Sequence, residues 1–107
     1  FVIAMELDPA TIDLETFFDI SKLGPFGKGN PRPLFFMQRD GSESLKPLGK
    51  TGLHFRISSD SGDFLAFNSS GLWDQYEDIQ GWIYYPDLNY WRGKLGVQLI
   101  LDRILVP

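Results

Sequence analysis

Two aromatic and two basic side chains stand within five residues near the end of this sequence, in Tyr90-Trp91-Arg92-Gly93-Lys94. Proteins hold unpaired nucleic acid with cations along its phosphates and flat rings against its bases. The segment carries both kinds of group, so it predicts contact with a single strand. The alternative for Trp91 is that it packs over one end of the fold, whereas alternation along a strand makes Tyr90 the exposed neighbour.

Most of the remaining positive charge stands in the middle of the chain. Residues 22–56 hold seven Lys and Arg against two acidic residues, although the whole chain has a net charge of −4. Charges further apart than ~10 Å are screened at physiological salt, so the local excess matters more than the total. Lys50, His54 and Arg56 are the candidates here, Lys50 in a predicted turn and the other two on the outward side of a predicted strand. The plainer alternative is a solvated basic face, with His54 an ordinary surface residue.

The residue types that catalysis needs are scarce. The chain has no Cys, which excludes disulfides, thiolate metal sites and cysteine nucleophiles, and its single His excludes metal sites built on two or more histidines. Ser58 and Ser59 follow His54 closely, but a turn composition supplies such serines anyway. The carboxylates at 60 and 63, and at 74, 77 and 78, fit solvated surface groups better than a divalent-metal site. We therefore assign no catalytic and no metal-binding residue.

Targeting and membrane signals are missing as well. No apolar run approaches the ~18 residues that a membrane helix needs, and the N-terminus lacks the basic flank of a signal peptide. The lack of Cys fits a reducing compartment. We expect a soluble, cytoplasmic protein with no membrane partner. The chain opens at Phe1 inside an apolar stretch, which predicts a fragment of a longer protein.

The hydrophobic pattern predicts one helix followed by strands. A helical repeat covers residues 14–23, with Asp13 as its N-cap. Residues 24–33 hold three Gly and three Pro and predict a shaped loop. Alternation then predicts strands at 34–38 and 45–48 separated by a turn or bulge at Asp40-Gly41, and further strands at 53–58 and 64–68. A short helix is predicted at 71–79, then two strands at 80–85 and 94–105 joined by a loop over 86–93.

If residues 34–48 count as one strand, the chain has five strands and a short helix between the third and the fourth. This is the layout of an OB-fold barrel. The predicted fold class is therefore mainly β, a five-stranded OB-fold barrel with an additional N-terminal helix. Five-stranded SH3-like barrels are the main alternative. We expect residues 1–23 to be the seam to a preceding domain and residues 24–107 to be the OB-fold domain. Trp73 is expected to plug the barrel, and the core takes either Trp82 with Tyr84 or Ile83 with Tyr85.

A family resemblance rests chiefly on residues 24–35, GPFGKGNPRPLF. This segment resembles the E-P-F-G-x-G-N-P-x-P-x-F signature of the RecJ family. RecJ proteins are the single-strand-specific 5′→3′ DNA exonucleases of the DHH phosphoesterase superfamily. Residues 48–55 (LGKTGLHF) are similar to the V-G-x-x-x-x-H-L-K-L stretch of that family, and residues 65–67 (LAF) to its A-I-A-F strand. Residues 85–93 (YPDLNYWRG) resemble its Y-x-P-x-x-N-x-W-x-G hairpin. The likeness covers roughly residues 14–104.

The resemblance implies an OB-fold module without the catalytic core. In RecJ the DHH and DHHA1 domains hold the Asp/His cluster that binds Mn²⁺ or Mg²⁺, and those motifs are absent here. This fragment is thus expected to need no cofactor, whereas its parent enzyme needs Mn²⁺ or Mg²⁺. Implied partners are single-stranded DNA, the chain's own DHH/DHHA1 core and a single-strand-binding protein.

The function implied is a single-stranded-DNA-binding module of an exonuclease in DNA repair and recombination. Lys28 and Arg32 stand where many relatives carry acidic residues, which would strengthen phosphate attraction if the loop faces DNA. The candidate nucleic-acid-binding residues are Phe26, Lys28, Asn30, Arg32, Lys50, His54, Arg56, Tyr90, Trp91, Arg92 and Lys94.

Two other functions remain open. The first is a protein-interaction module that docks on a repair partner or on the catalytic core, which the acidic composition outside residues 22–56 favours. The second is carbohydrate recognition, because OB barrels also bind oligosaccharides and aromatic loops suit sugar stacking. The resemblance to RecJ argues against the second.

Overall fold

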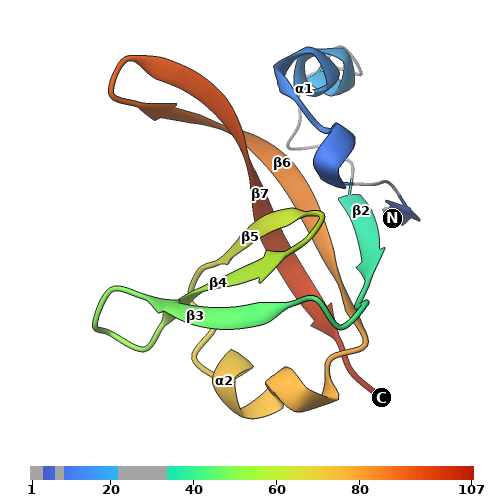
Figure 1. Cartoon of the computed structure of the whole chain (residues 1–107), viewed down its shortest axis with the longest axis vertical. Coiled ribbons are helices and arrows are strands. Elements are labelled where there is room, and N and C mark those ends of the chain that lie inside the picture. Colours follow the sequence, from blue (N-terminus) through green and yellow to red (C-terminus); the bar gives the residue numbers. More distant parts are fainter. Residues whose placement is uncertain (1–3, 7–8, 22–33) are drawn as a thin grey trace, which may run out of the picture.

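The fold is that of a computed structural model in which residues 4–6, 9–21 and 34–107 are described, with side chains for these ranges except at residues 4–6, 20, 21 and 91. Strands predominate (Figure 1). The elements in chain order are β1 (Ala4–Glu6), η1 (Pro9–Thr11), α1 (Leu14–Ser21), β2 (Leu34–Gln38), β3 (Ser44–Leu48), β4 (His54–Ser59), β5 (Gly62–Ala66), α2 (Leu72–Gln75), η2 (Tyr76–Asp78), β6 (Gly81–Trp91) and β7 (Lys94–Leu105).

The strands form one curved sheet in the order β1-β2-β6-β7-β5-β4-β3. Six of them, β2 to β7, make up its body, and the three-residue β1 adds in parallel to the outside of β2. Within this body, β5 and β7 are parallel. All its other neighbouring strands are antiparallel. A chain that is mainly β with this order, and with a short helix before β6, has an OB-like fold.

The predicted five-stranded barrel is wrong in two respects. Within the described ranges the sheet is open, because it ends at β1 on one side and at β3 on the other. The predicted first strand is also two strands, β2 and β3, broken at residues 39–43. The predicted turn at Asp40-Gly41 is confirmed, since Gly41 has a φ of 93°.

The break between β2 and β3 is held by the carboxylate of Glu43. It accepts hydrogen bonds from the backbone N–H groups of Asp40 and Gly41, both at 2.9 Å, and lies 3.3 Å from Nε of Arg39. The guanidinium of Arg39 also donates to the carbonyl of Tyr76 and lies over its ring, 4.2 Å from the centroid. Side-chain bonds of this kind offer the backbone a partner other than the next strand, so the ladder stops here.

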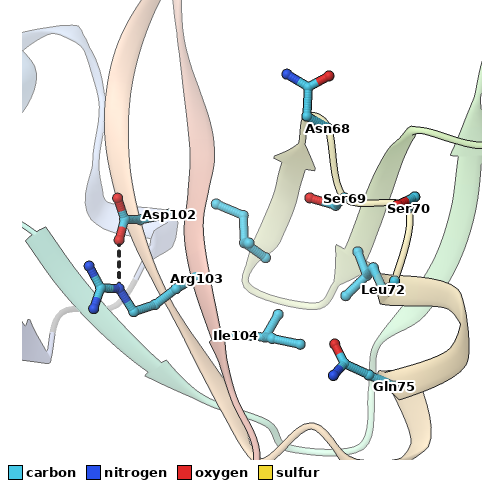
Figure 2. A pocket seen from close by; sticks show the side chains of 10 residues that line it. Asn68, Ser69, Ser70, Leu72, Gln75, Asp102, Arg103 and Ile104 are labelled. Carbon is cyan, nitrogen blue, oxygen red and sulfur yellow. Dashed lines mark hydrogen bonds and ion pairs between the residues drawn. The ribbon is translucent and has the colours of Figure 1, made fainter.

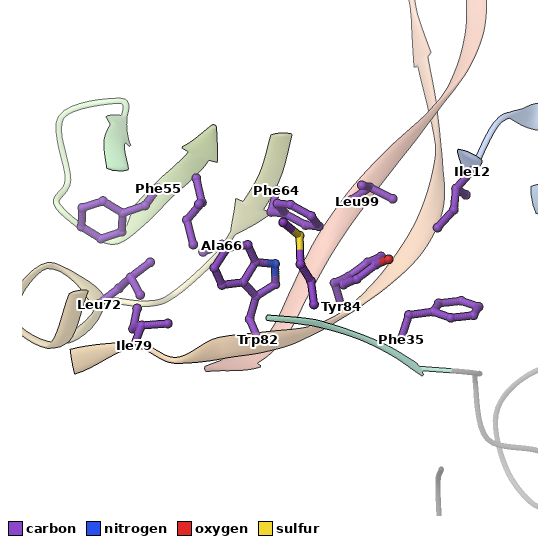
Figure 3. Close-up of a cluster of buried hydrophobic side chains, with 12 residues drawn as sticks. Ile12, Phe35, Phe55, Phe64, Ala66, Leu72, Ile79, Trp82, Tyr84 and Leu99 are labelled. Atoms are coloured by element: carbon purple, nitrogen blue, oxygen red, sulfur yellow. The ribbon is translucent and has the colours of Figure 1, made fainter. Parts of the chain in front are cut away.

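The core fills with alternate residues of the strands. Trp82 and Tyr84 on β6 are fully buried, and both rings meet Phe64 of β5 edge to face, at 5.2 and 5.0 Å between centroids (Figure 3). Ile83 and Tyr85 lie half-buried on the other face. Of the two predicted pairs, Trp82 with Tyr84 therefore fills the core, since side chains two apart on a strand share a face.

The prediction that Trp73 plugs the barrel is wrong. Leu72 takes that place with 3% of its surface exposed, whereas Trp73 is 59% exposed. Neighbouring residues on a helix point about 100° apart. Once Leu72 faces the core from the short α2, Trp73 faces solvent, with its ring stacked on the edge of the core at Phe55.

The predicted N-cap of α1 is confirmed. Oδ1 of Asp13 accepts a hydrogen bond of 2.9 Å from the N–H of Thr16, and this bond lowers the pKa of Asp13. The predicted end of the helix at residue 23 lies outside the described residues. Ile12, just before α1, packs into the core with 8% exposure. The predicted boundary between residues 23 and 24 stays a prediction.

The predicted loop over residues 86–93 is wrong, because β6 continues to Trp91 and pairs with β7 along its whole length. Only Arg92 and Gly93 connect the two strands, with φ values of 51° and 78°. Two consecutive positive φ values are typical of the type I′ hairpin turn. The pairing with β2 ends at Tyr84, so Pro86 lies where β6 has an open edge, and proline is tolerated there. The ribbon formed by β6 and β7 projects from the body of the fold (Figure 1).

Candidate nucleic-acid interface

The outer face of β3 and β4 carries a pair of like charges. The register places Lys46 of β3 directly opposite Arg56 of β4, and both side chains are exposed. In the part of the chain that the structure describes, neither has an ion-pair partner. Like charges at opposed positions of a sheet repel each other. This pair therefore leaves positive charge available to an anion from outside the domain.

Lys50 extends this positive charge beyond the ends of the strands. It lies exposed in the turn between β3 and β4, between Gly49 and Gly52, whose φ values are 73° and 72°. The register pairs Leu48 with His54 at the start of this turn. The turn is thus shaped by residues that adopt positive φ without strain, and it presents an ammonium group at the end of the outer face.

An aromatic pair, half-buried His54 and exposed Phe67, stands beside these cations. The rings of His54 and Phe67 meet edge to face with 5.5 Å between centroids, and Phe67 is 47% exposed. Nδ1 of His54 accepts a hydrogen bond of 3.1 Å from the N–H of Asn68, so the neutral ring carries its proton on Nε2. Phe67 was not among the sequence-predicted residues. Its signal is the alternation in β5, which puts Phe64 and Ala66 inside and leaves the residue that follows them outside.

The ribbon separates the groups that its sequence places side by side. Tyr90 is 72% exposed and lies opposite Leu95, while Lys94 is one residue further and lies on the other face of the ribbon. Lys94 and Ile100 lie on the same face of β7, because they are an even number of residues apart. Ile100 pairs with Leu65 of β5, and Leu65 pairs with Arg56 of β4. Lys94 and Arg56 therefore share a face of the sheet, and Tyr90 does not share it with them.

Several predicted residues are not placed. Phe26, Lys28, Asn30 and Arg32 lie outside the described residues, as does the side chain of Trp91. Arg92 is exposed in the turn at the tip of the ribbon. The structure thus brings together Lys50, His54 and Arg56 from the predicted set, and adds Lys46 and Phe67. Lys94 points to the same side of the sheet but lies at the tip of the ribbon.

A separate hollow of about 340 Å³ lies between β7 and the segment that leads into α2. It is lined by polar side chains such as Ser69 and Gln75 over an apolar floor that includes Leu72. Figure 2 shows the ion pair of Asp102 and Arg103, at 2.9 Å, on the other side of β7 from these groups. No uncompensated charge faces this hollow from the described residues, so the candidate interface lies elsewhere.

Neither a metal site nor a membrane segment is seen in the described ranges. They contain no group of three or more His, Cys, Asp or Glu side chains placed to hold a metal ion. None of their helices is long and apolar enough to span a bilayer.

The comparison with known families decides the identity. The family model of the RecJ OB domain matches residues 3–103. This chain belongs to the RecJ OB domain family. The RecJ OB domain does not include the catalytic core of RecJ. The resemblance that the proline- and glycine-rich segment predicted is confirmed.

A solved structure supports the fold of this RecJ OB domain. The chain is similar to RecJ from Thermus thermophilus, solved in complex with Mn²⁺, with a TM-score of 0.66 and 22% sequence identity. The similarity covers 99% of this chain and 16% of that chain. No curated protein sequence matches it. The OB-like arrangement of the strands is thus shared with RecJ of known structure.

Proposed function

We propose that this RecJ OB domain binds single-stranded DNA on the outer face of β3, β4 and β5, as the strand-holding module of a RecJ-like 5′→3′ exonuclease in DNA repair and recombination. The observation that carries the proposal is the opposed pair Lys46 and Arg56, without acidic partners in the described ranges, beside the exposed ring of Phe67. Cations and rings on one surface are what a sequence-independent grip on a single strand requires.

The division of labour follows from what the domain has. Its cations neutralise phosphates and its exposed ring stacks on a base, and neither interaction depends on the base sequence. Such a grip retains the strand while another domain removes nucleotides from its end. The DHH/DHHA1 core is the proposed partner within the parent protein, and any Mn²⁺ or Mg²⁺ would be bound there. A cytoplasmic location and contact with a single-strand-binding protein belong to the same proposal.

The salt dependence of binding tests the proposal. Four cations, Lys46, Lys50, Arg56 and Lys94, predict a slope of about −3 for log K against log salt, since each phosphate contact on a single strand contributes about −0.7. The measurement is a fluorescence titration of the chain with labelled oligo-dT at several salt concentrations. Lys46→Gln and Arg56→Gln should each make the slope shallower by about 0.7.

Arg103→Gln is the matched control, because Arg103 is an exposed cation that is already paired with Asp102. It should leave both the affinity and the slope unchanged. A slope near zero for the unaltered chain would refute the proposal. So would equal losses for Arg103→Gln and Arg56→Gln, since the interface would then have no defined position.

One observation favours a protein-interaction module as the second candidate. Trp73 is 59% exposed on α2, and Asp74, Glu77 and Asp78 are exposed around it. A large exposed apolar side chain with a charged rim is typical of a protein contact. This function predicts that the Lys46 and Arg56 variants bind oligo-dT as the unaltered chain does, which is the outcome that would favour it.

A further inference from the structure

A hollow of about 490 Å³ opens between β5 and the root of the ribbon. β5 and β7 pair at only two positions, Phe64 with Leu99 and Leu65 with Ile100. Before these positions the two strands diverge, because the ribbon continues past the start of β5 (Figure 1). The hollow is of the size of small-molecule sites, which range from about 300 to 1,000 Å³.

One part of its wall is apolar. Leu65 lines it from the outer face of β5, whereas Leu99 of β7 and Ile12 line it from the core side. Leu99 and Ile12 are buried and belong to the core, so this surface is held rigidly. A rigid apolar wall suits a flat ring, because a ring brings apolar area to it with little loss of conformational entropy.

Two amide side chains supply polar groups. Asn89 of β6 and Gln98 of β7 both line the hollow. Gln98 pairs with Asp87, and Asn89 is two residues after Asp87 on β6. Residues two apart on a strand share a face, so the two amides lie on one face of the ribbon. Neither side chain has a hydrogen-bond partner in the part of the chain that the structure describes. Each amide offers two donors and an acceptor, the groups that match the edges of nucleobases.

The hollow is continuous with the proposed interface through Arg56, which lines it and stands opposite Lys46. Asp63 is also at its wall and accepts hydrogen bonds only. A phosphate held by Arg56 would leave the base of the same nucleotide beside the amides. A carboxylate at that place favours a base that presents an amino group, as cytosine and adenine do and thymine does not.

We propose that this hollow receives one nucleobase of the bound strand, with its ring against Leu65 and its edge toward Asn89, Gln98 and Asp63. The inference rests on the proposed function, because Arg56 holds the phosphate of that nucleotide. It adds a preference for oligo-dC and oligo-dA over oligo-dT to a surface that otherwise reads no sequence.

The test compares labelled oligo-dC, oligo-dA and oligo-dT with an abasic oligomer of equal length. Leu65→Trp fills the hollow from the partly exposed face of β5 and should weaken oligo-dC binding about 5- to 150-fold, the value of one stacked base. It should leave the affinity for the abasic oligomer and the salt slope unchanged. Asn89→Leu with Gln98→Leu should abolish the preference for oligo-dC over oligo-dT. Gln75→Leu, which changes an exposed amide in the other hollow, is the control.

The two proposals fail in different ways. A salt slope near zero for the unaltered chain would remove the proposed function and this inference together. A normal slope with no preference among the oligonucleotides, or a preference that survives the double amide substitution, would overturn the inference alone. Binding of free dCMP as tight as that of oligo-dC would also overturn it, because the site would then serve a free nucleotide. Thermal melting of each variant shows that it is folded.

Discussion

The imidazole of His54 and the ring of Phe67 meet edge to face, 5.5 Å between centroids, on the outer surface of β4 and β5. The N–H of Asn68 fixes the imidazole by donating to Nδ1. His54 therefore acts as a support that orients an exposed ring. A base that stacks on Phe67 meets a surface already in position, so little ordering is needed on binding.

Replacement of this ring should weaken DNA binding. Phe67→Ala removes one stacking surface and is expected to cost about 1–3 kcal/mol, or about 5- to 150-fold in affinity for oligo-dT. The salt slope should stay as it is, because no charge changes. Fluorescence titration measures both quantities. Phe18→Ala, at another exposed phenylalanine on α1, should bind as the unaltered chain does, and an equal loss there would contradict a role specific to Phe67.

The turn at the tip of the ribbon contains a residue in an unfavourable backbone conformation. Arg92 has a φ of 51°, a conformation that costs a residue with a Cβ atom and that asparagine adopts more easily. Arg92→Asn should raise the free energy of unfolding by up to about 1 kcal/mol and should leave binding to oligo-dT nearly unchanged, because Arg92 is not one of the four cations of the proposed interface. Chemical denaturation and titration measure the two effects. Lys94→Asn, which removes a charge on a regular strand, should weaken binding without the gain in stability. A less stable Arg92→Asn variant would contradict this account of the turn.

Two glycines of β6 and β7 should respond differently to alanine. A Cβ atom on Gly81 would lie 2.5 Å from the carbonyl oxygen of Met37 and 3.2 Å from the ring of Phe36. Because the first contact is with backbone, β2 must shift, and Gly81→Ala is expected to lose about 1–3 kcal/mol of stability. Gly96→Ala is the matched control, since the nearest atom is 4.0 Å away. Thermal unfolding distinguishes them, and equal melting temperatures would contradict the close approach of β2 and β6.

The N-cap of α1 predicts a pH dependence. The hydrogen bond from Thr16 lowers the pKa of Asp13, so its charge favours the folded state above the ordinary carboxyl pKa of about 4. This contribution is lost as the pH falls through the lowered value of the folded state. Asp13→Ala should lower the melting temperature at neutral pH. In strong acid, the melting temperature of the unaltered chain should no longer exceed that of Asp13→Asn, whose cap does not titrate. A constant difference across this range would contradict the assignment.

Local pattern was sufficient for part of the candidate interface. Strict alternation in residues 53–58 placed His54 and Arg56 outside and Phe55 and Ile57 inside, as the structure has them. Alternation over residues 64–68 places Phe67 outside, but it was missed as a candidate because only the position of His54 on the neighbouring strand gives it a partner. The opposition of Lys46 and Arg56 is likewise a matter of register between strands, which no single segment encodes.

The sequence by itself determined the family, the mainly β class, the cap of α1 and the buried side of β4. These depend on neighbours along the chain: a motif, a capping residue, an alternation with period two. Tertiary structure decided where β2 gives way to β3, how far β6 extends and which of Leu72 and Trp73 enters the core. Each of these depends on a partner distant in sequence, namely Tyr76 under Arg39, β7 along β6, and the shape of the space that β4, β5 and β6 enclose.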